Sequence, residues 1–231
     1  MRVPQLKENP KGSQKWVQEI INFCPGFLNK LIHQKLAFLS GREIQWTSPL
    51  EHDEFSEYRD AAFLENLHLQ EHTEELKKFW PKMGPQWDAL GRTSDPKDRK
   101  AFILVEAKAN VPELISFCGA KDKESLKTIS ASLAETQDWL NCQEPRIDWK
   151  CGFYQYANRL AHLYFLREKA QKEAYLVFLY FVNDPTHIST SLDAWISALE
   201  LQRKLMGLSA GSLEGKVIEV FINTNDIKYD H

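Results

Sequence analysis

The chain has 231 residues, of which 43% are hydrophobic, enough to bury the core of one large domain. Its formal charge of −3 argues against coating long stretches of duplex, which requires many lysine and arginine contacts. The N-terminus lacks the apolar segment of a secretory signal, and the longest apolar run, residues 174–182, is about half as long as a membrane helix. The four cysteines show neither the density of a disulfide scaffold nor zinc-ligand spacing, so a cytoplasmic protein with reduced thiols is expected.

Residues 1–47 are expected to form a helical extension packed on the core, ahead of a main domain at residues 48–231. Residues 1–13 are polar and contain two prolines, which predicts an irregular start. Apolar side chains then recur at helical spacing from Trp16 to Leu36, with an interruption at Pro25-Gly26. This pattern predicts a helical hairpin, and residues 42–47 predict a short strand after it.

Residues 54–67 predict a well-buried helix, because their apolar side chains lie on several sides of a helical projection. At about 100° per residue, Glu57 falls between Ala61 and Leu64 and is expected to face inward. Two interpretations of Glu57 stay open. It is either a carboxylate that reaches a functional site or a boundary side chain in a solvent-exposed ion pair.

Two neighbouring strands are predicted in the middle of the chain, at residues 87–91 and 101–105. Both segments are short and apolar, and polar residues 93–100 separate them. Gly91 and the cluster Ser94-Asp95-Pro96 are typical of a turn. The two segments are therefore expected to form a β-hairpin.

Charged residues occur where the two predicted strands would adjoin. The second strand ends in Glu106-Ala107-Lys108, and because side chains alternate along a strand, Glu106 and Lys108 share one face. An acid, any residue and then lysine recurs elsewhere in this chain, but only this copy closes a run of five apolar residues. Such a pair is costly to desolvate without partners. We expect it to converge with Asp88 on one cation and one water.

The chain after the hairpin predicts alternating helices and strands. Residues 111–123 predict a loop with a short helical turn. The predicted helices lie at residues 124–140, 152–169 and 192–206, and the predicted strands at 174–182 and 216–222. The first of these strands is apolar throughout, which is typical of a central strand covered on both faces. The order of elements predicts an α/β fold, a mixed β-sheet flanked by helices.

The helix at residues 152–169 carries a polar stripe on an otherwise apolar surface. Gln155, Asn158, Arg159 and His162 gather within about 100° of arc at helical spacing. Such a stripe meets water, a polar site or a ligand. For His162 a solvent-facing position is the favoured interpretation, and for Gln155 a functional one.

At Pro85-Gln86-Trp87-Asp88 and Glu106-Ala107-Lys108 the chain resembles the PD-(D/E)XK superfamily of restriction-endonuclease-like nucleases. The motif covers about thirty residues, and the order of elements extends the likeness to roughly residues 50–185. The resemblance implies a restriction-endonuclease-like sheet with an N-terminal helical extension. It also implies metal-dependent hydrolysis of phosphodiester bonds.

The resemblance assigns roles to the residues of the two strand ends. Asp88 and Glu106 would bind Mg²⁺ or Mn²⁺, with the main-chain carbonyl of Ala107 as a further ligand. Lys108 would orient or help to deprotonate the attacking water. Glu57 would bind the metal directly or through water.

The resemblance also implicates the helix that follows. Gln155 stands where several branches of the superfamily carry a glutamine near the site, but Arg159 replaces the tyrosine expected four residues later. Arg159 and Asn158 are expected to bind substrate. Nucleic acid is the expected partner, with DNA favoured over RNA, no membrane association, and a homodimer left open.

Three alternatives remain beside the nuclease. The chain could keep this fold without catalysis, as a subunit that binds proteins or nucleic acid, which seven tryptophans would suit. Glu106 and Lys108 could form a purely structural ion pair. The pattern His68-Leu69-Gln70-Glu71-His72 matches a zinc-protease motif, although no third ligand stands out.

Overall fold

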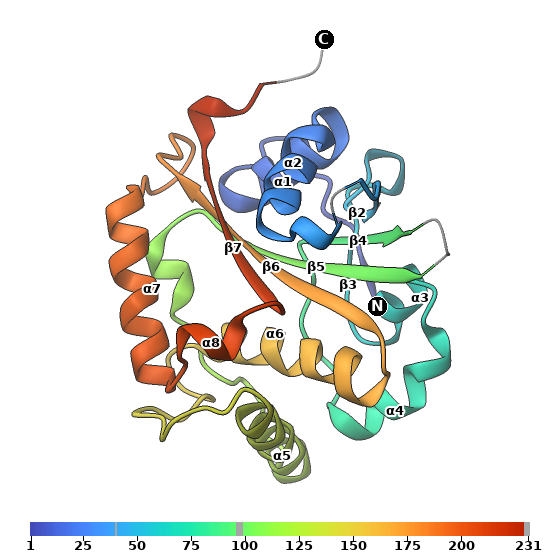
Figure 1. Cartoon of the computed structure of the whole chain (residues 1–231), viewed down its shortest axis with the longest axis vertical. Coiled ribbons are helices and arrows are strands. Elements are labelled where there is room, and N and C mark those ends of the chain that lie inside the picture. The colour runs from blue at the N-terminus through green and yellow to red at the C-terminus, as the bar shows by residue number, and fades with distance from the viewer. Residues whose placement is uncertain (40, 96–98, 229–231) are drawn as a thin grey trace.

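A five-stranded mixed sheet forms the centre of the computed structural model, which describes residues 1–39, 41–95 and 99–228 (Figure 1). Its strands, in spatial order, are β2 (Ile44–Ser48), β4 (Ala89–Ser94), β5 (Lys100–Lys108), β6 (Glu173–Val182) and β7 (Val217–Asn223). Neighbours from β2 to β5 are antiparallel, whereas β5, β6 and β7 run parallel. The predicted α/β class, a mixed sheet flanked by helices, is confirmed.

The strand β6 is the most deeply enclosed element of the sheet. It lies between β5 and β7, and from Ala174 to Val182 every side chain is buried. A parallel strand covered on both faces needs apolar residues at every position, not only at alternate ones. The prediction of a central strand at residues 174–182 is therefore confirmed, and the last strand, β7, lies at an edge of the sheet.

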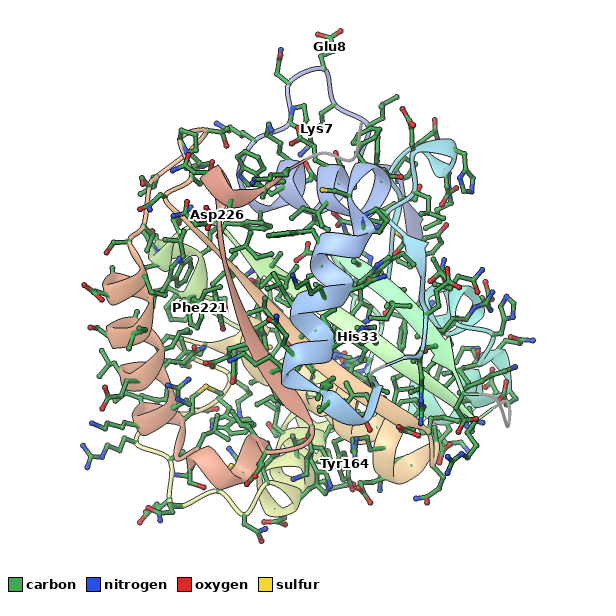
Figure 2. The ribbon with its side chains drawn as sticks, turned by 45° about the horizontal axis from the view of Figure 1, so that its top comes forward. Lys7, Glu8, His33, Tyr164, Phe221 and Asp226 are labelled. Carbon is green, nitrogen blue, oxygen red and sulfur yellow. The ribbon has the colours of Figure 1, made fainter. Side chains whose placement is uncertain are left out.

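Two N-terminal helices, α1 (Gly12–Phe23) and α2 (Pro25–Lys35), cover one face of the sheet. Their apolar side chains form one buried cluster with β-sheet residues such as Val105, Val177 and Ile222. Figure 2 shows the two helices in front of the sheet, with His33 on α2. The predicted helical hairpin is confirmed. The predicted domain boundary at residue 47 falls within β2, and the division into two domains stays a prediction.

The remaining helices gather against the opposite face and the edges of the sheet (Figure 1). They are α3 (Ala61–Asn66), α4 (Thr73–Phe79), α5 (Lys123–Trp139), α6 (Tyr154–Tyr164), α7 (Leu192–Met206) and α8 (Ala210–Leu213). The predicted helices at residues 124–140, 152–169 and 192–206 are confirmed, with a π-helical turn at Phe165–Lys169 extending α6. Side chains of β5 and β6 such as Leu104 and Leu176 join this second core.

The prediction of one helix at residues 54–67 is wrong in its first half. Glu57–Tyr58 form the short strand β3, which pairs with β1 (Arg2–Val3), so the N-terminus is not entirely irregular either. Glu54, Phe55 and Asp60 have positive φ angles, which no α-helix accommodates. Pairing with residues more than fifty positions away has overridden the local helical periodicity.

Gly91 lies inside β4 and not in a turn, which corrects the sequence prediction. It pairs with Trp46 on one side and Ile103 on the other. The hairpin closes later, where the backbone N–H of Asp95 donates to the carbonyl of Arg99 (3.1 Å). Pro96, also assigned to the turn, lies outside the described residues.

Two sequence predictions concern membranes and cysteines. Within residues 1–39, 41–95 and 99–228, no helix has the length and apolar character needed to cross a bilayer. Within the described residues, none of Cys24, Cys118, Cys142 and Cys151 forms a disulfide.

Substitution of Gly91 by valine is expected to destabilise the protein by about 1–3 kcal/mol. A Cβ at this position would lie 3.0 Å from Cε3 of Trp46, whose indole N–H is held by Asn29 (2.9 Å). Urea unfolding measures the change. Gly119→Val is the control, because a Cβ there meets nothing within 4 Å, and we expect a change within about 0.5 kcal/mol. Equal losses in the two variants would contradict this account.

Candidate active site

The antiparallel pairing of β4 and β5 brings the two predicted strand ends together. Ala89 pairs with Val105, so Asp88, just before β4, lies beside the last residues of β5. The backbone N–H of Asp88 donates to the carbonyl of Val105 (3.2 Å), and Oδ2 of Asp88 accepts from the N–H of Ala107 (2.7 Å). Asp88, Glu106 and Lys108 thus occur at one end of the sheet.

Glu106 is a buried carboxylate with two cationic partners. Its Oε2 accepts from Nε (2.6 Å) and contacts Nη2 (2.5 Å) of Arg159, while its Oε1 lies 2.6 Å from Nζ of Lys108. Only 2% of the residue is exposed. Burial opposes the charged form, but Arg159 and Lys108 outweigh it and hold the pKa of Glu106 below its ordinary value. Glu106 is therefore ionised at neutral pH.

Lys108 lies between Glu106 and the exposed Gln155 of α6. Its Nζ donates to Oε1 of Gln155 (2.9 Å). Burial acts to lower the pKa of Lys108, but the charges of Glu106 and Asp88 raise it above its ordinary value. In this state Lys108 is an ammonium group that donates hydrogen bonds and cannot accept a proton from water.

Asp88 has acidic neighbours, whereas Glu106 is held by cationic ones. Burial, followed by the charges of Glu106 and Glu57, raises the pKa of Asp88 well above its ordinary value. In the described part of the chain, no hydrogen bond reaches its Oδ1. A partly buried carboxylate beside two other acids is stabilised by a proton or by a cation.

Glu57 faces the site from a strand and not from the predicted helix. It lies on β3, is 7% exposed, and accepts hydrogen bonds from Gln86 Nε2 (2.5 Å) and Gln14 Nε2 (3.4 Å). Burial is the main cause that raises the pKa of Glu57, and Glu106 adds to it. The expected inward orientation of Glu57 is observed, and its role at a functional site stays a prediction.

Arg159 and Asn158, predicted to bind substrate, are buried among protein groups. Beyond Glu106, Arg159 donates from Nη1 to Asn158 Oδ1 (2.8 Å) and from Nη2 to the carbonyl of Gln86 (2.7 Å). Its guanidinium lies 5.1 Å from the centre of the Trp87 ring. The contacts of Arg159 make it a positioning group for Glu106. No sequence pattern identified Gln86 or Gln14 as hydrogen-bond donors to Glu57, because these contacts join segments that are distant in sequence.

His162 does not face solvent, which corrects the interpretation favoured from the sequence. It is 1% exposed and packs edge-on against the rings of Phe63, Trp80 and Trp87. Its Nδ1 lies 2.9 Å from the carbonyl oxygen of Asn158. Burial lowers the pKa of His162 to about 3, so the ring is neutral at physiological pH.

The zinc-protease alternative fails on geometry. His68 has a left-handed backbone and lies outside the short 3-10 helix that contains His72, so the two imidazoles do not share a helix face. His68 contacts Arg92 (2.8 Å), and His72 contacts Glu75 (3.4 Å). Among the described residues, no group of three His, Cys, Asp or Glu side chains is placed to hold a metal ion.

The acidic groups of the site are candidate ligands for a divalent cation. Mg²⁺ typically uses one or two carboxylates and keeps several waters, so it does not require three acidic side chains. Asp88 has a raised pKa, two acidic neighbours, and an oxygen that accepts no hydrogen bond from the residues that the structure describes. This donor set fits a hard cation, which would relieve the repulsion among the acids.

Replacement of Arg159 by methionine is expected to destabilise the protein by about 3–5 kcal/mol, because it leaves Glu106 with one partner in a buried place. Lys108→Met is expected to cost less, since Glu106 then keeps both contacts with Arg159. Chemical denaturation compares the two variants. A larger loss for Lys108→Met would contradict the assignment of Arg159 as the main support of Glu106.

The ring of His162 is expected to stay neutral between about pH 8 and pH 5. The folded pKa of about 3 is below the ordinary value of 6.5, so the unfolded chain binds the proton more readily. The contribution of His162 to the unfolding free energy is thus complete above pH 6.5 and is lost as the pH falls from 6.5 toward 3. NMR of the ring protons, assigned by comparison with His162→Gln, measures the titration of His162. A titration midpoint above about pH 5 would refute it.

Comparison with known proteins yields no match to a family model, a curated protein or a solved structure.

Proposed function

We propose that this protein is a metal-dependent nuclease that hydrolyses phosphodiester bonds of nucleic acid. The observation that carries the proposal is the contact between the strand ends, where Asp88 accepts from the N–H of Ala107, the residue between Glu106 and Lys108. A mixed sheet with helices on both faces also supports it. Together these features agree with the arrangement that the resemblance to PD-(D/E)XK nucleases implies.

Asp88 and Glu106 would hold Mg²⁺ or Mn²⁺. The carbonyl of Ala107 and, through a water, Glu57 would contribute by resemblance. A bound divalent cation supplies a water of lowered pKa and neutralises charge on the phosphoryl oxygens. Oδ1 of Asp88 is available for it, whereas Lys108 occupies Oε1 of Glu106. A cation at Glu106 therefore competes with Lys108.

The other polar residues of the site would act by position and charge. Lys108 carries its proton, so it would donate a hydrogen bond to the attacking water or to the phosphate and offset negative charge. Gln155 holds the Lys108 ammonium at the exposed side of the site. Arg159 keeps Glu106 ionised and oriented from the buried side.

The proposed substrate is nucleic acid, with DNA favoured over RNA. The formal charge of −3 means that binding would depend on local contacts at the site and not on a general positive surface. A homodimer and a cytoplasmic location stay predictions.

One observation favours a second function, a non-catalytic domain that binds protein or nucleic acid. Both oxygens of Glu106 already have cationic partners, as in a structural ion-pair network. Within the part of the chain that the structure describes, no three-residue metal group accompanies them. In that case Asp88 would bind no metal.

Metal-dependent cleavage is expected from the wild-type chain and not from Asp88→Asn or Lys108→Met. Labelled single- and double-stranded DNA and RNA are incubated with Mg²⁺ or Mn²⁺, and with a chelator as a control. Lys100→Met, at the exposed opposite end of β5, is the matched control and should cleave like wild type. A loss of about 100-fold or more is expected for Asp88→Asn, which removes a metal ligand.

Calorimetric titration with Mn²⁺ distinguishes the two functions when no substrate is cut. Binding that Asp88→Asn abolishes supports the metal site, whereas absence of binding in the wild type favours the non-catalytic domain. Cleavage that survives both site substitutions would refute the assigned residues.

A further inference from the structure

A small cavity lies beside Glu106 and Lys108. It is lined by the end of β5, by the 3-10 turn Val111–Leu114, by β6, by α6 and by α7, and its volume is about 10 Å³. Besides Glu106 and Lys108, its lining includes Tyr156, Tyr180 and Gln202. The volume is that of about one water molecule.

Four buried polar atoms on residues that line this cavity have no partner among the described residues. They are the hydroxyl groups of Tyr156 and Tyr180 and both the Nε2 and Oε1 atoms of Gln202. The three residues are 5%, 0% and 1% exposed, respectively. Buried polar groups without partners are rare in folded proteins and are commonly satisfied by an ordered water. Four such atoms around one cavity therefore indicate a shared ligand.

The sheet holds these groups beside the candidate site. In the β5–β6 register, Tyr180 is the partner of Lys108 and Phe178 is the partner of Glu106. Because paired residues point to the same face, Tyr180 extends the polar row begun by Glu106 and Lys108. The ring of Tyr156 stacks on Phe178 with centroids 4.4 Å apart and fixes its hydroxyl from the helix side.

We propose that this cavity is a binding site for one water molecule, held by Tyr156, Tyr180 and Gln202, that positions the Glu106–Lys108 pair from behind. The occupancy of the site is independent of the nuclease function. Its positioning role in catalysis rests on that proposed function.

A neutral water suits the cavity better than an ion. The charges of Glu106 and Lys108 compensate each other across a 2.6 Å contact. Glu113 also lines the cavity, but both of its carboxylate oxygens already accept hydrogen bonds, from the N–H of Ala109 (3.1 Å) and from Nδ2 of Asn110 (2.5 Å). The three side chains whose polar atoms lack partners are uncharged. Burial raises the pKa of both tyrosines above the ordinary value, so their hydroxyls stay protonated and can donate. One water offers two donors and two acceptors, enough to engage the four atoms that lack partners.

The site would matter because the side chain of Lys108 lines the cavity in addition to contacting its two partners. Glu106 and Gln155 fix its ammonium, while its other flank meets the cavity. A bound water fills that flank and limits the positions that the side chain adopts. Removal of the polar atoms would loosen Lys108 without removing any residue that contacts substrate.

Direct observation of the water tests its occupancy. A crystal structure of the full chain at atomic resolution is expected to show one ordered water within hydrogen-bond distance of Tyr180 and Gln202. The proposal would be overturned if the cavity showed no electron density for a water, or if the hydroxyls of Tyr156 and Tyr180 bonded to protein groups instead. This part of the test uses the wild-type chain, so it does not depend on whether a variant folds.

Two nearly isosteric variants, Tyr180→Phe and Gln202→Met, test the positioning role. We expect the NMR signal of the Lys108 ammonium to shift or broaden in both. We also expect cleavage to fall about 10-fold in kcat with KM unchanged. Tyr164→Phe is the control, because that hydroxyl donates to Glu135 at the surface (2.9 Å) and does not line the cavity, and it should leave both readouts unchanged.

The outcomes separate the two proposals. A water in the crystal with an unchanged Lys108 signal in both variants would overturn the positioning role. A water and a changed Lys108 signal in a protein that cuts no substrate would uphold this inference and count against the nuclease.

Discussion

The buried carboxylate of Glu106 is the group on which the candidate site depends. A carboxylate that is 2% exposed is strongly unfavourable alone, and it is stable here because Arg159 and Lys108 bind both of its oxygens. Lys108 is on the same strand, but Arg159 comes from α6, so the charge of Glu106 is satisfied only after helix and sheet have docked. Formation of the site and packing of the core are thus one event.

The same surroundings give the two strand-end carboxylates opposite properties. Glu106 has two cations at contact distance, and its pKa falls, whereas burial and, after it, two acidic neighbours raise the pKa of Asp88. Neighbouring carboxylates whose pKa values are shifted in opposite directions are typical of sites that bind protons or cations. A structural ion pair alone would account for Glu106, but not for the neighbouring Asp88, whose Oδ1 accepts no hydrogen bond within the described part of the chain.

Local patterns predicted much of this fold because they reflect burial directly. The strand β6 is apolar at successive positions since helices cover both faces of the sheet, and α7 has the helical spacing of a one-sided element. The patterns failed where distant segments decided the conformation. Glu57 lies in a strand because β1 pairs with it, and Gly91 lies within β4, where the Trp46 ring leaves no room for a side chain.

By itself the sequence determined that Glu106 and Lys108 share a face and that Asp88 reaches their end of the sheet. Alternation along a strand and pairing in a hairpin follow from backbone geometry over a short stretch. Only the tertiary structure decided that Arg159 is bound to Glu106, that His162 is buried, and that Tyr180 and Gln202 meet behind Lys108. These contacts depend on how α6 and α7 dock on the sheet, and docking is set by the packing of the whole core and not by the spacing of any one segment.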